Sequence, residues 1–186
     1  MKSFLTIIVM SVVSFNSMAI EYSMGVDLHS GVNKFESGFA QEANYFDYGV
    51  SSGSNFNLTL GYFMVLLGSD SIYAIEVDGN NVDETLVNLN LSAAMGATYL
   101  HGRTLRVSML YGVDYLISGK ASNTCQNCEA VINEVIGGDY LQPIVDLYLW
   151  DVTPIFKVGL MASTKWYFNG SLDGEWVLGV SGILKK

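Results

Sequence analysis

The chain has 186 residues, of which half are hydrophobic and only 15% are charged, and its mean hydropathy is +0.31. This composition is too apolar for an ordinary soluble domain, yet no run after the first twenty residues reaches the roughly 18 apolar residues of a spanning helix. The net charge of −9, with nine basic residues, leaves no basic patch for nucleic acid. The apolar residues must be spread through short segments, as in a membrane β-barrel.

The N-terminus has the features of a secretory signal. Lys2 supplies a positive charge, residues 4–15 are apolar apart from Ser and Thr, and a Ser-Met-Ala sequence ending at Ala19 provides a processing site. We expect residues 1–19 to be a signal peptide and residues 20–186 to form one barrel domain. A single N-terminal membrane anchor is the alternative.

Alternation of apolar and polar residues is the dominant pattern of the remaining chain. It is clearest between Val87 and Tyr99, where Val, Leu, Ala, Met and Tyr alternate with Asn, Ser, Gly and Thr. Several alternating segments exceed ten residues, which favours strands that cross a membrane in roughly 9–11 residues. The predicted strands are residues 21–30, 55–66, 73–78, 87–99, 105–115, 141–149, 156–165 and 175–182.

The predicted connections differ in length. Short turns are expected at 68–70, 101–103 and 151–153, and long loops at 32–44, 79–85, 119–139 and 167–174. Short turns at one end and long loops at the other are the pattern of outer-membrane barrels, with both termini on the periplasmic side. Aromatic residues near strand ends suggest two interfacial girdles: Tyr45, Phe46, Tyr48, Tyr99, Tyr115, Trp150, Trp166, Tyr167 and Phe168.

This pattern resembles the small eight-stranded outer-membrane barrels, the group that includes the transmembrane domain of OmpA and the OmpX-like proteins. The resemblance covers the whole mature chain and rests on no single motif. It departs at the C-terminus, where Leu184, Lys185 and Lys186 replace the usual final aromatic residue. It implies an all-β fold, an eight-stranded antiparallel up-and-down transmembrane β-barrel. The implied location is the bacterial outer membrane, after export through the periplasm.

Alternation alone does not say which face of the barrel is inside. An apolar interior would make a soluble lipocalin-like calyx, and an apolar exterior a membrane barrel. The polar face carries both signs of charge among small residues, which suits the narrow lumen of eight strands. The expected lumen charge network consists of Asp27, His29, Glu76, Arg106, Asp114, Asp146, Lys157, Lys165 and Glu175. It is either a salt-bridge plug or an ion pathway gated by rearranging pairs.

Cys125 and Cys128 form a Cys-x-x-Cys sequence in the longest predicted loop. Without a second cysteine pair or a nearby histidine, an exported chain is expected to close them into a disulfide; a metal site or reactive thiols are the alternatives. His29 beside Asp27 could join a hydrolase triad with a serine from another strand, but no local motif supports one. We therefore expect no catalytic residue, no metal and no cofactor.

The sequence favours a structural or surface-interaction protein whose long extracellular loops carry any specificity. The alternatives are a narrow channel or transporter for small solutes or ions, a lipid-modifying outer-membrane enzyme, and a soluble ligand-binding calyx. The expected partners are outer-membrane lipid, lipopolysaccharide and, during biogenesis, the barrel-assembly machinery. We expect a monomer that binds no nucleic acid.

Overall fold

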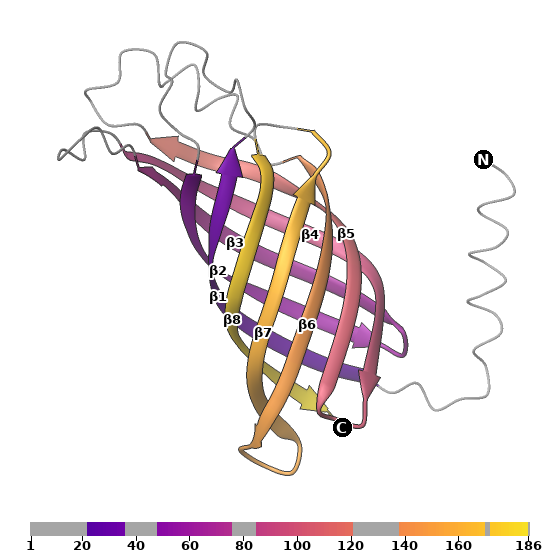
Figure 1. Cartoon of the computed structure of the whole chain (residues 1–186). Coiled ribbons are helices and arrows are strands. Elements are labelled where there is room, and N and C mark those ends of the chain that lie inside the picture. The colour runs from indigo at the N-terminus through magenta and orange to yellow at the C-terminus, as the bar shows by residue number, and fades with distance from the viewer. Residues whose placement is uncertain (1–21, 36–47, 76–84, 121–137, 170–171, 186) are drawn as a thin grey trace, which may run out of the picture.

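The computed structural model describes residues 22–35, 48–75, 85–120, 138–169 and 172–185, which form a closed barrel. Every strand is antiparallel to its neighbours in sequence, and β8 pairs with β1 to close the sheet (Figure 1). The strands are β1 (Tyr22–Phe35), β2 (Tyr48–Leu60), β3 (Phe63–Ile75), β4 (Thr85–His101), β5 (Leu105–Lys120), β6 (Asp139–Asp151), β7 (Phe156–Tyr167) and β8 (Leu172–Lys185). The described residues contain no helix long and apolar enough to cross a membrane.

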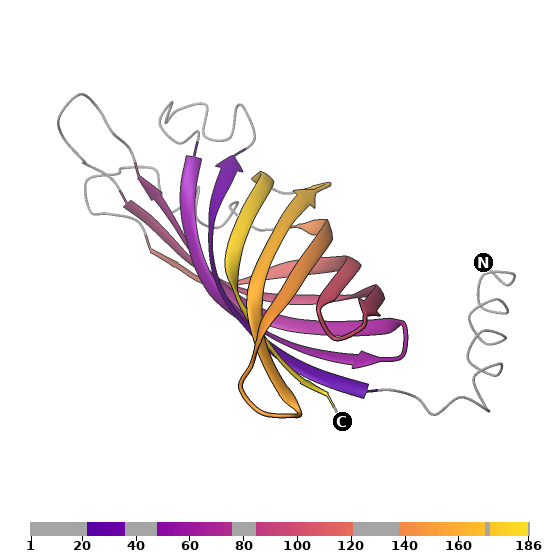
Figure 2. The ribbon, with the colours of Figure 1, turned by 60° about the horizontal axis from the view of Figure 1, so that its bottom comes forward.

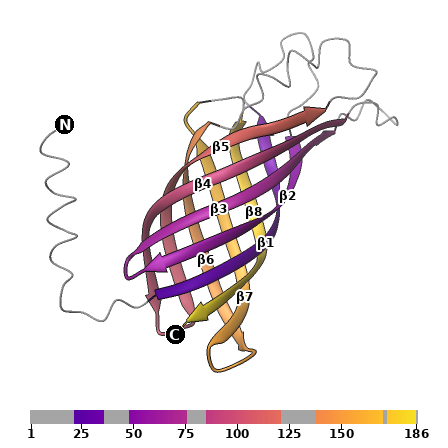
Figure 3. The ribbon, with the colours of Figure 1, turned by 180° about the vertical axis from the view of Figure 1, so that it is seen from behind.

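The strands are strongly tilted, as the views from the two sides show (Figures 1 and 3). The shortest strand, β7, has 12 residues and the longest, β4, has 17. A 12-residue strand that rises about 3.3 Å per residue and tilts by about 40° spans roughly 30 Å. Each strand is therefore long enough to cross the apolar band of a membrane barrel, which is about 25 Å tall.

The two ends of the barrel differ. Short turns at 61–62, 102–104 and 152–155 lie at the end where β1 begins and β8 ends, the lower end in Figures 1 and 2. The paired ends of β1 and β2, β3 and β4, β5 and β6, and β7 and β8 lie at the opposite end. The predicted disulfide residues Cys125 and Cys128 and the predicted signal peptide lie outside the described residues.

The expected strand 55–66 and the expected turn 68–70 are both wrong. The chain turns at Gly61, whose φ of +61° permits a two-residue hairpin loop with glycine at its first position. Phe56 and Leu60 point outward before this turn, whereas Met64 points into the barrel after it. Apolar residues occupy even-numbered positions on both sides of the turn, although these positions face outward in β2 and inward in β3. The sequence pattern therefore looks like one continuous strand.

The outer wall of the barrel is apolar and its interior is largely polar. Outward residues such as Val26, Leu67, Met95 and Tyr111 are exposed along the strands, whereas the inward residues between them are buried. The apolar interior that a ligand-binding calyx requires is therefore wrong. Apolar side chains also enter the lumen. One group of them packs together and consists of Met64, Leu66, Ala94, Leu110, Tyr140, Ile144, Met161 and Val177.

Exposed aromatic residues lie near both ends of the wall. Tyr62 and Tyr99 stack at the short-turn end with ring centroids 6.3 Å apart, and Trp150 lies at the end of β6. Trp166 and Phe168 are exposed at the opposite end of the barrel. Two girdles of this kind suit the two interfaces of a lipid bilayer. Tyr167 differs from the prediction, because its hydroxyl turns inward and hydrogen-bonds Asp114.

Candidate functional site: two ion-pair clusters in the lumen

The first cluster surrounds Arg106 on β5 and is called the Arg106 cluster. The Arg106 guanidinium donates through Nε to Asp146 Oδ2 at 2.8 Å and through Nη1 to Asn57 Oδ1 at 2.7 Å. Asn57 in turn donates to Asp27 Oδ2 at 3.1 Å, and Arg106 Nη2 lies 3.9 Å from Asp27 Oδ1. The guanidinium also lies over the ring of Tyr148, 5.7 Å from its centroid. One cation thus joins residues of β1, β2, β5 and β6 across the lumen.

The second cluster surrounds Lys165 on β7 and is called the Lys165 cluster. The ammonium lies 2.9 Å from Asp70 Oδ2, 3.2 Å from Asp114 Oδ2 and 3.5 Å from Glu175 Oε2. These carboxylates come from β3, β5 and β8, so one lysine connects strands from opposite parts of the barrel. Tyr167 donates to Asp114 at 2.6 Å and Ser51 donates to Glu175, which adds partners for the carboxylates.

Asp70 is the most connected acceptor of the Lys165 cluster. Its Oδ2 accepts from Lys165 and, at 3.0 Å, from Ser92, while its Oδ1 lies 2.5 Å from His29 Nε2. Gly53 makes room for this arrangement, because a Cβ at that position would meet the Asp70 carboxylate and lie 2.8 Å from His29 Nε2. His29 and Asp70 therefore lie flat against the inner wall.

Tyr140 shields Lys165 from the other side. Its ring centroid lies 4.9 Å from Lys165 Nζ, in the geometry of a cation–π contact. The ring lies directly on Gly112, where a Cβ would come within 2.5 Å of Tyr140 Cζ and 2.6 Å of Ala94 Cβ. Glycine at position 112 is thus what allows the aromatic ring to reach the lysine.

The lumen carries more negative than positive groups. Among the described residues that are buried inside the barrel, five carboxylates face two permanent cations, Arg106 and Lys165. The carboxylates are Asp27, Asp70, Asp114, Asp146 and Glu175. Buried charges are costly unless they are paired and hydrogen-bonded. Each of the two cations therefore pairs with more than one carboxylate, and these ion pairs stabilise the interior.

Several buried polar atoms have no hydrogen-bond partner within the described part of the chain. They include Oδ1 of Asp27, Asp114 and Asp146 and the side-chain amide of Asn33. Buried polar atoms in proteins are nearly always satisfied by protein or ordered water. The interior is thus polar enough to hold water beside the side chains that fill it.

The structure places the predicted network residues in different locations. Asp27, Arg106 and Asp146 belong to the Arg106 cluster, and His29, Asp114, Lys165 and Glu175 belong to the Lys165 cluster. Lys157 belongs to neither, since it pairs with the exposed Asp151 at 3.1 Å near the short-turn rim. Glu76 lies outside the described residues. The alternation pattern predicts a single charge network, whereas the closed barrel divides these residues into two clusters.

Sequence reasoning misses Asp70, because it assigns residues 68–70 to a turn. The signal was present, since alternation from exposed Tyr73 back along β3 places Asp70 on the inward face. The predicted charge network also does not include the two tyrosines of β6, although alternation places Tyr148 on the polar face. A spacing of eight residues puts the rings of both Tyr140 and Tyr148 inside. An aromatic residue on a polar face gives no sequence signal that it covers a cation.

The triad considered for His29 does not form within the described residues. His29 Nε2 faces Asp70, and Nδ1 lies 3.4 Å from the amide nitrogen of Asn55. Neither ring nitrogen contacts a serine hydroxyl there, and Ser92 donates to Asp70. No group of three or more His, Cys, Asp or Glu side chains in the described ranges is arranged to hold a metal ion.

No protein-family model matches the sequence, and no curated protein sequence is significantly similar to it. Solved structures of similar architecture include Neisserial surface protein A, with 11% identity, a TM-score of 0.44, and coverage of 89% of this chain and 97% of that one. They also include Ail, the attachment invasion locus protein of Yersinia pestis, in a phospholipid bilayer nanodisc. That comparison has 14% identity, a TM-score of 0.41, and coverage of 90% of this chain and 99% of the other.

Proposed function

We propose that this chain is a bacterial outer-membrane β-barrel with a structural or surface-interaction role. The observation that carries the proposal is the inverted polarity of the barrel, with apolar side chains outside and charged side chains inside. A wall of exposed leucine, valine, methionine and aromatic residues is unfavourable in water. The same wall is stabilised by lipid, while the ion pairs keep their charges within the lumen.

The filled lumen supports an anchoring role over an open pore. Arg106, Tyr140 and Tyr148 are among the largest fully buried side chains, and apolar residues such as Leu66 and Leu110 fill further space. An eight-stranded barrel is just wide enough for its interior to be filled by side chains. The rigid barrel would then present its long connecting segments at the cell surface, in contact with lipid and lipopolysaccharide, and no catalytic step is assigned to it.

Cell fractionation combined with gel mobility tests this proposal. The protein should be found in the outer-membrane fraction and need detergent for extraction. A closed barrel should also migrate differently in SDS gels before and after boiling, because the folded sheet resists SDS until it is heated. Recovery from the soluble periplasmic fraction, with the same mobility in both samples, would overturn the proposal.

A narrow cation path is the second candidate function, and the excess of carboxylates in the lumen favours it. The five carboxylates and two permanent cations that are buried in the described part of the barrel would attract cations and repel anions. Passage would require Arg106 or Lys165 to leave its partners temporarily. Current across planar bilayers separates this candidate from a permanently sealed anchor.

A further inference from the structure

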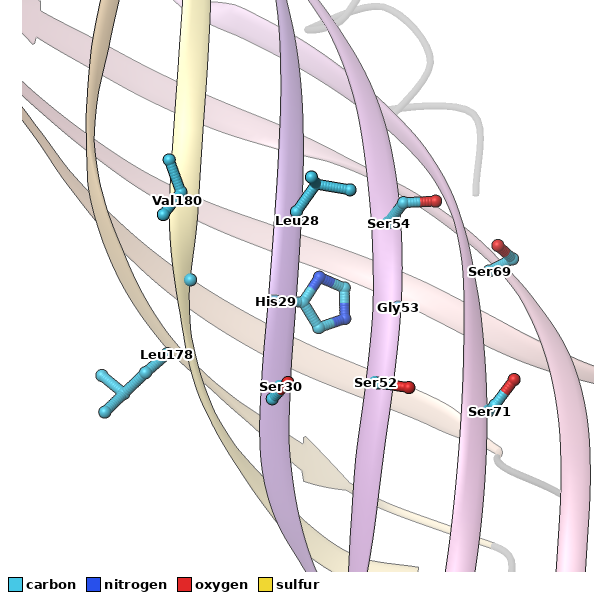
Figure 4. Close-up of a pocket in the computed structure, with 11 residues that line it drawn as sticks. Leu28, His29, Ser30, Ser52, Gly53, Ser54, Ser69, Ser71, Leu178 and Val180 are labelled. Atoms are coloured by element: carbon cyan, nitrogen blue, oxygen red, sulfur yellow. The ribbon is translucent and has the colours of Figure 1, made fainter.

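The outer wall of the barrel contains a hollow of about 550 Å³ over β8, β1, β2 and β3. Its outward-facing lining is polar at its centre, and Figure 4 shows serines on three neighbouring strands. We call this surface the serine hollow, and its serines are Ser30, Ser52, Ser54, Ser69 and Ser71. Leucine and valine side chains border it on β1 and β8.

The serines are contiguous because of strand register. Ser52 lies opposite Ser71 and Ser54 opposite Ser69 across β2 and β3, and Ser30 lies opposite Ser52 across β1 and β2. Short side chains at adjacent outward positions leave the hollow between the longer side chains around them. The hollow therefore depends on the five serine positions together with Gly53 and Gly179, which also line it.

The serine hollow lies at the middle of the apolar wall. Ser54 is the seventh of the thirteen residues of β2, and Ser69 is the seventh of the thirteen residues of β3. In a membrane this level is the hydrocarbon centre, where a hydroxyl without a hydrogen-bond partner is costly. None of the five hydroxyls has a hydrogen-bond partner within the described ranges. The hollow therefore needs a partner that supplies polar groups at this depth.

A projecting side chain lies beside the serine hollow at the same level. Leu178 is 71% exposed, the highest value among the exposed large hydrophobic residues that the structure describes. It is the seventh of the fourteen residues of β8, and its side chain points away from the strand (Figure 4). The wall thus carries a projection and a recess side by side, both at mid-depth.

We propose that the serine hollow docks a second copy of this chain within the membrane, an inference that rests on the proposed membrane location. A two-fold axis along the membrane normal keeps every residue at its depth, so Leu178 of each copy can enter the hollow of the other. In such an interface the same patch serves both copies. This proposed dimer departs from the monomer that we expect from the sequence.

The chemistry of serine suits this pairing. A hydroxyl both donates and accepts, so a patch of hydroxyls is complementary to its own copy. Small residues let two membrane-embedded backbones approach closely, and serines hydrogen-bond across such contacts. A lipid acyl chain could fill the same volume, but it would leave the hydroxyls without partners.

Sedimentation equilibrium of the full chain in density-matched detergent micelles tests the inference. The wild type should form a reversible dimer. The double variant Ser54→Leu/Ser69→Leu fills the hollow, and Leu178→Ala removes the projection; each should raise the dimer dissociation constant by about tenfold or more. Leu147→Ala, an exposed leucine on β6, is the matched control and should leave the constant unchanged.

Cross-linking tests the geometry independently. A mixture of the Leu178→Cys and Ser54→Cys variants should form covalent dimers across the interface, whereas wild type mixed with either variant should form far fewer. Every variant is first checked for the SDS gel shift on boiling, which shows that its barrel is folded.

The outcomes separate this inference from the proposed function. If the protein is a heat-modifiable membrane protein that stays monomeric, or if its dimer dissociation constant does not change in these variants, the proposed dimer is overturned but the proposed membrane barrel is not. A monomer that carries a bound acyl chain in mass spectra overturns it in the same way. A wild-type chain that remains soluble without detergent overturns both.

Discussion

At the scale of single residues, Lys165 and Lys157 form a natural comparison on one strand. Lys165 is buried among three carboxylates, whereas the ion-pair partner of Lys157 within the described ranges is Asp151, whose side chain is 67% exposed. Removing one partner of a buried ion pair leaves charge uncompensated, while exposed pairs contribute little. Both lysines form ion pairs, but we expect the loss of Lys165 to destabilise the fold far more than the loss of Lys157.

We predict that Lys165→Met lowers the free energy of unfolding by roughly 3–5 kcal/mol, because Asp70, Asp114 and Glu175 would then repel each other without a cation. Lys157→Met is the control and should change the free energy of unfolding by less than about 1 kcal/mol. Urea unfolding of barrels in lipid vesicles measures both values. Equal effects of the two substitutions would mean that the Lys165 cluster does not stabilise the fold.

Arg106 tests whether the geometry of the cation matters as well as its charge. Its guanidinium contacts Asp146 and Asn57 through different nitrogens, which a single ammonium group cannot reproduce in the same plane. We expect Arg106→Lys to lower the free energy of unfolding by about 1–3 kcal/mol although it keeps the charge. An unchanged unfolding curve for this variant would show that charge alone is sufficient in the Arg106 cluster.

At the scale of elements, the hairpin between β2 and β3 depends on one glycine. Gly61 adopts a φ of +61°, a conformation that side-chain-bearing residues adopt at a cost. We expect Gly61→Ala to lower the free energy of unfolding by about 1 kcal/mol. Gly174→Ala is the control, since its Cβ would make only an ordinary 3.4 Å contact with the Lys165 carbonyl oxygen. An equal loss in both variants would indicate a general effect of alanine rather than of the turn.

This hairpin also explains where sequence prediction fails. Alternation correctly predicts eight antiparallel strands and the faces of most of them, because period-2 alternation is a direct consequence of strand geometry. It places the turn seven residues late, at Gly68 instead of Gly61, because apolar residues continue at even positions on both sides of the true turn. Both Asp70 and Ser69 then lie in a false loop. Because of this misplaced turn, the sequence predicts neither the role of Asp70 as an acceptor in the Lys165 cluster nor the place of Ser69 in the serine hollow.

At the scale of the whole molecule, closure determines which residues meet. Arg106 and Asp27 are far apart in sequence and on strands that are not adjacent, yet they approach across the lumen. Sequence reasoning can place each residue on the inner face, but strand tilt and stagger decide its level along the axis. The division into two clusters therefore follows from the closed barrel and is not visible in the alternation pattern.

The charge of the closed lumen leads to a prediction about conduction. We expect wild-type barrels in planar bilayers to conduct rarely, because the two clusters fill the interior. Any current should be carried by cations, since five carboxylates outnumber two permanent cations among the buried residues that the structure describes. Arg106→Ala removes a large buried side chain and a positive charge, so it should increase both the current and the cation selectivity.

The reversal potential in a potassium chloride gradient measures the selectivity, with Lys157→Ala at the rim as the control. Anion-selective current, or a steady wild-type conductance that Arg106→Ala leaves unchanged, would contradict a lumen closed by these ion pairs.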